Sequence, residues 1–365
     1  MKLSDTVLKY EEQVALALRE LYGSHGYAPF RMSRFEEYDL YVRNKSFLVS
    51  DSVITFTDTD GKLMALKPDV TLSIVKNCRP AKGAQEKVYY NENVFRVSRG
   101  THAFREIGQT GLECIGDLDV FALSEVLTLA AESLALIDAE YVLDLSHLGV
   151  VGAAIDALGV DGECRTGLLA ALGEKNPHGV RALLNGAGAT GPAADAFLAL
   201  LTAEGAPKAV LPRLFTAFAG NEAATAALSE LEAVLSALGE GTRVRLDFSV
   251  VHDMHYYSGI VFRGFVPRVS AGILAGGQYD RLVRKLGRAS GAVGFAVYLD
   301  LLEERTPRRE GLDCDVFLLY GEDDAPAAVR EAALALRRDG ARVRTGSALP
   351  EGLRCGRILT VKEAR

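Results

Sequence analysis

Hydrophobic and polar positions along the chain follow two different periods. Near the start, Val14 and Leu18 belong to a set that recurs every three or four residues, which predicts an amphipathic helix over residues 6–22. Other runs are rich in β-branched and aromatic residues and predict strands. These strands span residues 53–57, 63–66, 87–97, 109–116, 141–145, 244–248 and 256–262. An Asp-Gly pair between the first two indicates a hairpin, and helices are predicted after Pro68 and over residues 119–138.

The stretch over residues 148–242 differs in character, because it is rich in Ala, Leu and Gly and reads as mostly helical. Strand patterns on both sides of it predict a helical insertion in a sheet domain. After a Pro/Arg/Glu-rich linker, a short unit is predicted to contain strands and one helix at 315–320, 326–338, 341–345 and 357–361. We therefore expect an α+β fold, an antiparallel sheet with flanking helices. Its predicted domains are residues 1–147 with 243–305, the insertion 148–242, and a C-terminal α/β unit 312–365.

Composition narrows the function classes. The chain has 365 residues, of which 48% are hydrophobic and 24% charged, and its net charge is −7. This acidic balance lacks the basic surplus that neutralises phosphates, so we expect no nucleic-acid partner. Five cysteines without a C-x-x-C pair indicate reduced thiols rather than disulfides or zinc. No signal segment is evident and no stretch approaches the roughly 20 apolar residues of a membrane span, so a cytoplasmic location without membrane contact is expected.

Two short motifs carry little weight. Residues 186–191 match G-x-G-x-x-G, but the residues before them look helical, so we interpret them as a loop between helices rather than a dinucleotide site. The run His252-Asp253-Met254-His255 suggests a metal site, yet no further ligand cluster accompanies it. The sequence therefore predicts neither a metal nor a cofactor.

A set of polar residues suggests a small-molecule pocket. If residues 109–113 form a strand, Gln109 and Glu113 lie on the same face, with Gly111 leaving room between them. Asp69 and Thr71 add a carboxylate and a hydroxyl at a turn. Such groups can accept hydrogen bonds from an ammonium and an imidazole N–H, and the amide can donate to a carboxylate. From these residues alone, a solvated sheet face is an equally good interpretation.

Three groups of segments together resemble the catalytic core of histidyl-tRNA synthetase, a class II aminoacyl-tRNA synthetase, over about residues 1–305. The segments are Leu66-Lys67-Pro68-Asp69-Val70-Thr71; 89–96 with 108–116; and 255–262 with 275–282 and 292–296. The resemblance implies a class II synthetase-like sheet. It also implies a histidine site formed by Asp69, Thr71, Gln109, Glu113, Tyr256 and Tyr257, with Asp69 in place of a longer glutamate. Arg96 matches an arginine that grips ATP and adenylate phosphate in that family.

Departures from the family pattern concern ATP activation. Leu301 stands where the synthetase has an ATP-clamping arginine, and Tyr298 fills a glycine position. His252 aligns with the catalytic arginine and cannot provide the same permanent bidentate charge. Val97, Ser98 and Ser33 also depart from the family residues. Arg96 and His252 are therefore expected to be only a remnant of a phosphate or adenylate site, and no catalytic residue is predicted.

The C-terminal unit resembles only the beginning of the synthetase's anticodon-binding domain. Residues 313–365 hold nine acidic and nine basic residues, a poor basis for gripping RNA. We interpret this unit as a packing or oligomerisation module.

A synthetase-like core without activation residues resembles the regulatory subunit of ATP phosphoribosyltransferase. The resemblance implies a non-catalytic, allosteric subunit that assembles with the short-form catalytic subunit for the first step of histidine biosynthesis. It further implies that histidine binds for feedback inhibition, and that the chain is a homodimer within a hetero-oligomer. The alternatives are a divergent histidyl-tRNA synthetase, another amino-acid-activating paralogue, or an RNA-sensing pseudo-synthetase.

Overall fold

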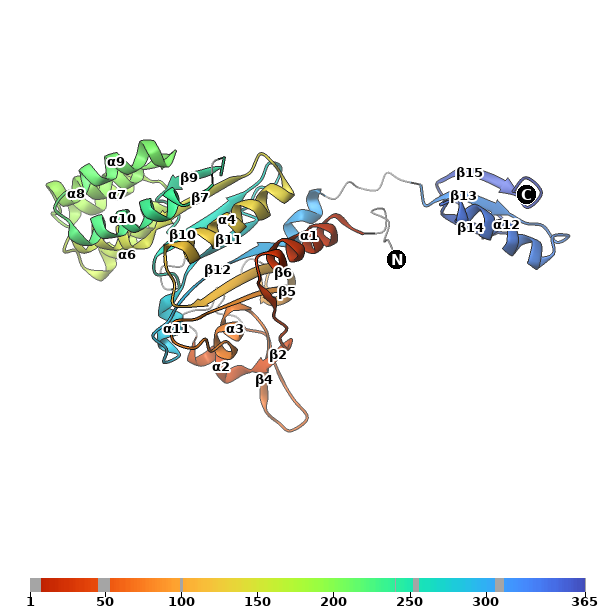
Figure 1. Ribbon diagram of the computed structural model, residues 1–365, viewed down its shortest axis with the longest axis horizontal. Helices are drawn as coiled ribbons and strands as arrows, with labels where there is room; N and C mark the ends of the chain where they lie inside the picture. Colours follow the sequence, from red (N-terminus) through yellow and green to blue (C-terminus); the bar gives the residue numbers. More distant parts are fainter. Residues whose placement is uncertain are drawn as a thin grey trace. The chain divides into compact units, whose positions relative to one another are not determined.

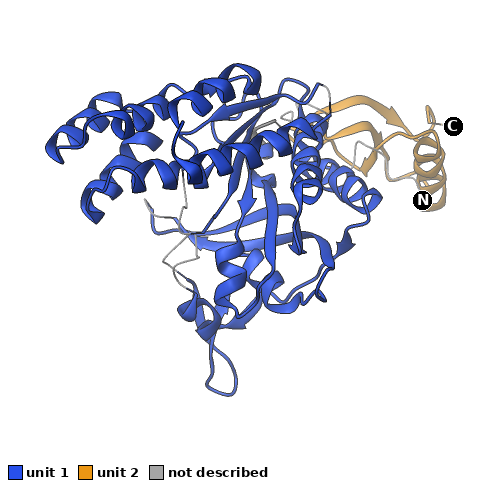
Figure 2. Cartoon of the chain, turned by 60° about the vertical axis from the view of Figure 1, so that its left-hand side comes forward, with its two compact units in different colours: residues 1–305 blue, residues 306–365 orange. Residues whose placement is uncertain are grey.

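The chain forms two compact units, residues 1–305 and residues 306–365 (Figure 2). The computed structural model describes residues 8–44, 53–98, 101–239, 241–251, 256–305 and 312–364. Each unit encloses hydrophobic side chains of its own, so the two are described separately.

A nine-stranded sheet forms the centre of the first unit. Its strand order is β1-β5-β6-β12-β11-β10-β7-β9-β8, and neighbouring strands are antiparallel except for β1 with β5 and β7 with β9. The strands are β1 Ala28–Pro29, β5 Gln85–Val97, β6 Phe104–Gly116, β7 Val142–His147, β8 Glu204–Gly205, β9 Val244–Asp247, β10 Ile260–Phe265, β11 Leu274–Gln278 and β12 Gly291–Tyr298. This antiparallel-rich sheet with flanking helices confirms the predicted fold class.

Helices α1 (Tyr10–Ser24) and α4 (Val120–Ile137) pack against the sheet and each other (Figure 1). The Asp119 side chain caps the N-terminus of α4 by accepting a hydrogen bond from the Ala122 N–H. The hydroxyl oxygens of Tyr22 in α1 and Ser133 in α4 are 3.0 Å apart. By length and composition alone α4 could cross a membrane, so the expectation that no stretch approaches this length is wrong. Because 61% of α4 is buried inside the protein, it behaves here as a core helix.

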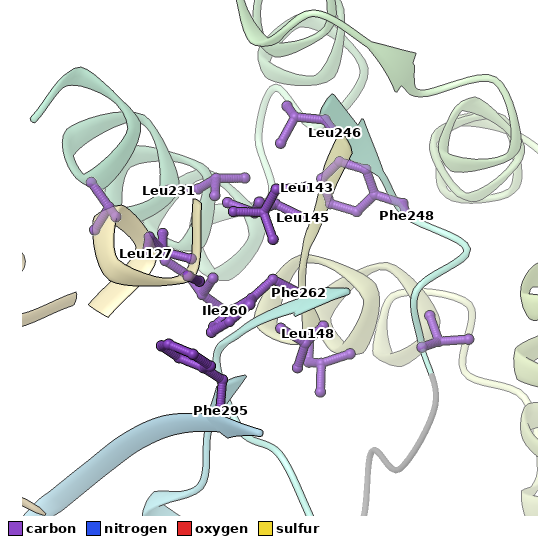
Figure 3. Close-up of a cluster of buried hydrophobic side chains, with 14 of the residues drawn as sticks. Leu127, Leu143, Leu145, Leu148, Leu231, Leu246, Phe248, Ile260, Phe262 and Phe295 are labelled. Carbon is purple, nitrogen blue, oxygen red and sulfur yellow. The ribbon is translucent and has the colours of Figure 1, made fainter. Parts of the chain in front are cut away.

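The main core lies between these helices and the sheet. Figure 3 shows side chains from α4, the sheet and the helical segment converging in it. All the labelled residues are buried; they are Leu127, Leu143, Leu145, Leu148, Leu231, Leu246, Phe248, Ile260, Phe262 and Phe295. Alternation explains this arrangement, because Phe295 faces the core while its neighbours on β12 face the opposite side.

Six helices fill the region predicted to be helical. They are α5 Leu148–Asp156, α6 Gly162–Gly173, α7 Pro177–Gly186, α8 Pro192–Leu201, α9 Pro207–Ala217 and α10 Glu222–Ser236. Figure 1 shows α6 to α10 as one group beside β7 and β9. The glycine-rich run at 186–191 joins α7 to α8, which confirms its interpretation as a loop between helices. The treatment of this region as a separate inserted domain stays a prediction, since its core is continuous with that of the sheet.

A small antiparallel sheet lies at the opposite end of the main sheet from these helices. It contains β2 Phe35–Glu37, β3 Thr55–Thr57 and β4 Leu63–Leu66 in the order β2-β4-β3, with α2 Tyr38–Arg43 and α3 Thr71–Asn77 nearby in sequence. The predicted β3–β4 hairpin is thus confirmed. Gly61 has φ +80° in its turn, a conformation that glycine adopts without strain.

The second unit is a three-stranded parallel sheet with one helix. Its elements are β13 Cys314–Leu319, α12 Pro326–Arg338, β14 Val343–Gly346 and β15 Cys355–Thr360, and the strand order is β14-β13-β15. Val316 and Leu318 pack against α12. These elements agree with the predicted strand, helix and two strands.

Candidate ligand-binding pocket

One face of β5, β6 and β12 forms the floor of a pocket. Pairing places Glu113 opposite Gly294 and Gly111 opposite Ala296. At the next position along the strands, Gln109 lies opposite Tyr298. Directly opposed residues in antiparallel strands point to the same side, so these side chains share one face. The lining of this pocket also includes Asp69 and Thr71, which lie outside the sheet.

Glu113 lies at the buried end of this floor with only 2% of its surface exposed. Thr71 Oγ1 donates to its Oε1 at 2.6 Å, and the Tyr279 hydroxyl donates to its Oε2. Burial raises the pKa of Glu113 to about 8; the two hydroxyl donors oppose this rise and the charge of Asp69 adds to it. Without a cationic ligand, Glu113 is therefore largely protonated at neutral pH.

Asp69 provides a second carboxyl group beside Glu113. Its Oδ1 accepts a hydrogen bond from the Leu72 N–H at 2.8 Å, in the first turn of α3. Burial raises the pKa of Asp69, while this backbone donor and the charge of Arg96 lower it. Two buried carboxyl groups in one pocket favour a ligand that brings positive charge or several N–H donors.

The segment that carries Asp69 and Thr71 is anchored to β5. The Phe95 N–H donates to the Lys67 carbonyl at 2.8 Å, and Arg96 Nε donates to the Pro68 carbonyl at 3.0 Å. The fully buried Lys67 ammonium is 2.8 Å from Glu92 Oε2. These contacts hold the turn over the sheet, which explains how residues distant in sequence meet above Glu113.

Three tyrosines add aromatic surface to the pocket. The rings of Tyr256 and Tyr257 pack edge to face with their centroids 4.7 Å apart. The ring centroids of Tyr256 and Tyr279 are 5.7 Å apart. All three line the pocket. Aromatic rings in such an arrangement suit a flat ligand group such as an imidazole, because ring pairs favour edge-to-face or offset contacts.

Small residues on the floor are required by the close packing. A Cβ at Gly294 would lie 1.7 Å from Glu113 Oε2, and one at Gly111 would lie 2.1 Å from the Phe295 carbonyl oxygen. Tyr90 crosses the floor next to Gly111, and its hydroxyl donates to that same carbonyl at 3.4 Å. The glycines therefore make room for Glu113 and Tyr90.

The structure brings together seven of the eight predicted site residues. The residues lining the pocket are Asp69, Thr71, Gln109, Glu113, Tyr256, Tyr257 and Arg96. His252, predicted as part of the phosphate-site remnant, lies outside the described residues, as do its neighbours in the suggested metal cluster. Leu301 belongs to the 3-10 helix η2 (Leu299–Arg305) and packs against the main core rather than lining the pocket.

Sequence reasoning did not assign Tyr90, Tyr279 and Tyr298 to the site, although all three line it. Alternation along β5 and β12 could have found two of them, because Tyr90 lies opposite Gly111 and Tyr298 opposite Gln109. Tyr279 lies between β11 and α11 (Asp280–Lys285), so no periodicity signals its contact with Glu113.

Comparison with known proteins identifies relatives of this architecture. Residues 3–302 match the family model described as histidyl-tRNA synthetase. The ATP phosphoribosyltransferase regulatory subunit of Geobacillus thermodenitrificans is 30% identical over 351 residues, covering 91% of this chain and 86% of the relative. That of Clostridium kluyveri is 27% identical over 355 residues, covering 91% and 88%.

Solved structures share the fold. An ATP phosphoribosyltransferase regulatory subunit/histidyl-tRNA synthetase from Bacillus halodurans has a TM-score of 0.78 at 24% identity, over 96% of this chain and 93% of that one. A chain of the ATP phosphoribosyl transferase (HisG:HisZ) complex from Thermotoga maritima has a TM-score of 0.62 at 18% identity, over 80% and 97%. These two likenesses concern the fold alone. The family match and the relative that is 30% identical show that this chain belongs to the histidyl-tRNA synthetase-like family, among its ATP phosphoribosyltransferase regulatory subunits.

Proposed function

We propose that this chain is a non-catalytic regulatory subunit that assembles with a catalytic ATP phosphoribosyltransferase subunit and binds free histidine in the pocket over β6 and β12. In this role it supports the first step of histidine biosynthesis and transmits feedback inhibition. The relatives are named as such regulatory subunits, and a structure of similar fold comes from a complex of this enzyme.

The paired carboxyl groups of Glu113 and Asp69 are the observation that carries this proposal. They lie in a pocket of small volume with aromatic rings on one side and Arg96 and Gln109 also in its lining. Histidine carries an ammonium and imidazole N–H donors for the carboxyl groups, and a carboxylate for the guanidinium and the amide. Its flat ring also suits the tyrosine surface.

The chain is proposed to lack adenylation activity. Leu301 packs into the core and offers no charge to a triphosphate. Arg96 Nε donates a hydrogen bond to the Pro68 carbonyl. Arg96 is the one arginine among the pocket-lining residues described. Because stabilising the charge of a phosphoryl transition state requires several preorganised donors, a single arginine is insufficient.

Histidine can act on a partner only if it binds two states of the assembly with different affinity. We infer that ligand contacts with Glu113 and Thr71 connect β6 to α3, and that this connection biases the assembly towards its inhibited state. We further propose that the chain is a homodimer within the hetero-oligomer, acts in the cytoplasm, and keeps residues 312–365 as a packing module.

The first test is isothermal titration of the purified chain with histidine, together with histidine-dependent ATP–pyrophosphate exchange on the same sample. We expect binding without exchange. Glu113→Gln should abolish most of the binding, whereas the exposed control Glu20→Gln should leave it unchanged. Robust exchange would instead return the chain to the amino-acid-activating enzymes.

The second test mixes the chain with a short-form catalytic subunit. Light scattering should show a complex larger than either component, and phosphoribosyltransferase activity should depend on the chain. Histidine should inhibit the complex containing the Glu20→Gln variant, and much less the complex containing Glu113→Gln. Unchanged inhibition with Glu113→Gln would place the histidine site elsewhere.

A further inference from the structure

Tyr298 stands at the end of the pocket floor away from Glu113. It is the last residue of β12 and lies opposite Gln109, four positions along β6 from Glu113. At about 3.4 Å per residue, the Cα position of Tyr298 is roughly 14 Å along the strand direction from that of Glu113. Its N–H donates to the Ile273 carbonyl at 2.8 Å, which fixes its backbone to the segment before β11.

Tyr298 shares the pocket face with the small residues of the floor, Gly111 and Ala296. It lines the pocket together with Tyr90 and Gln109. Tyr90 is opposite Gly111, which is itself opposite Ala296, so Tyr90 and Tyr298 lie on the same face of the sheet with a glycine and an alanine between their strands' ends.

The charges of the pocket set the direction in which a zwitterionic amino acid binds. A cationic group of the ligand would face the carboxyl groups of Glu113 and Asp69. Gln109 lies opposite Tyr298 at the other end of the strands, and its amide can donate a hydrogen bond to a carboxylate there. A carboxylate therefore binds best on the side where Tyr298 stands.

We propose that Tyr298 determines ligand length in this pocket: its ring blocks the space beyond the ligand carboxylate, so the site accepts a free amino acid and excludes one extended through its carboxylate. This inference rests on the proposed histidine site and specifies its ligand class. Excluded ligands include peptides and acyl derivatives whose leading residue alone would fit. Selection here works by steric rejection rather than by additional attraction.

The test compares histidine with the dipeptide L-histidylglycine, which keeps the ammonium, the imidazole and a terminal carboxylate. Titrations are made on the full chain, on Tyr298→Ala, and on Tyr298→Phe, which keeps the ring and loses only the hydroxyl. We expect the unaltered chain and Tyr298→Phe to bind histidine and reject the dipeptide. Tyr298→Ala should raise the affinity for the dipeptide relative to the affinity for histidine by at least about tenfold compared with the unaltered chain.

Equal rejection of the dipeptide by Tyr298→Ala, or its tight binding by the unaltered chain, would overturn the inference while histidine binding stands. Failure of the unaltered chain to bind histidine would overturn the proposed function, and the inference with it. Thermal unfolding checks each variant. If Tyr298→Ala does not fold, Tyr298→Val removes the same ring with a residue that suits a strand better.

Discussion

The hydroxyl of Thr71 donates a 2.6 Å hydrogen bond to Oε1 of Glu113, although the two residues are 42 positions apart. Thr71 is the first residue of α3 and Glu113 lies in β6, so this bond joins a helix to the pocket floor. The Tyr279 hydroxyl donates to the other carboxyl oxygen. A carboxylate has about four lone-pair sites, so Glu113, once ionised beside a cationic ligand, keeps acceptor capacity for that ligand.

Protonation of Glu113 should make folding stability depend on pH. Its pKa is raised from 4.5 to about 8, so between these values the folded chain keeps a proton that the unfolded chain releases. Stability contributed by this group is complete below about pH 4.5 and decreases as pH rises towards about 8. A glutamine at this position does not titrate. As pH rises through this range, the free energy of unfolding of Glu113→Gln should therefore increase relative to that of the unaltered chain.

Urea unfolding of both proteins at pH 5, 6.5 and 8 checks this expectation. The comparison with the variant isolates Glu113 from Asp69, whose pKa is raised as well. A stability difference that stays constant with pH would show that Glu113 is ionised in the folded chain.

Histidine binding should release a proton near neutral pH. A cationic group beside Glu113 favours its carboxylate, so a proton present in the free pocket leaves on binding. Titrations at pH 7 in phosphate and in Tris, which differ in ionisation enthalpy, should yield different apparent binding enthalpies corresponding to release of up to about one proton. The Glu113→Gln variant serves as the control for other groups. Identical enthalpies in the two buffers, or net proton uptake, would contradict this view of Glu113.

The period of the strands accounts for much of what could be predicted. Two-residue alternation placed Gln109 and Glu113 on one face, and both line the pocket. Strands β11 and β12 were harder to recognise, because glycine and alanine have low strand propensity. Those small residues are needed for close approach, as Gly294 shows beneath Glu113. Contacts such as Tyr279 with Glu113 depend on pairing between distant strands, which local patterns do not encode.

Gly294→Ala should disrupt the pocket. The new Cβ would lie 1.7 Å from Glu113 Oε2 and 2.4 Å from the Leu112 carbonyl oxygen, and a backbone atom cannot move aside at low cost. We expect loss of histidine binding and a decrease of about 1–3 kcal/mol in the free energy of unfolding. Gly152→Ala is the matched control, since nothing lies within 4 Å of a Cβ at that position in α5. It should stabilise the helix by about 0.5–1 kcal/mol. Histidine binding by Gly294→Ala at unaltered affinity would show that the ligand does not use Glu113.

Substitutions of Arg245 and Arg342 test how burial changes the contribution of similar ion pairs to the free energy of unfolding. Arg245 contacts both oxygens of Asp144 at 2.7 Å, joining β9 to β7, and Asp144 is only 3% exposed. Arg342 makes a similar bidentate contact with Asp315 at 3.1 and 2.9 Å, but both side chains are more than 40% exposed.

Arg245→Ala should cost about 2 kcal/mol of unfolding free energy, because it leaves the buried carboxylate of Asp144 without its partner and also removes the more exposed contact with Glu204, while the partial exposure of Arg245 limits the loss. Arg342→Ala should cost less than about 1 kcal/mol, since water solvates both groups of an exposed pair. Native-state hydrogen exchange can follow β7 and β13 separately, which matters because the two residues lie in different compact units. Equal losses of unfolding free energy in the two variants would mean that water reaches Asp144 when Arg245 is removed. Burial would then add little to the stabilisation by this ion pair.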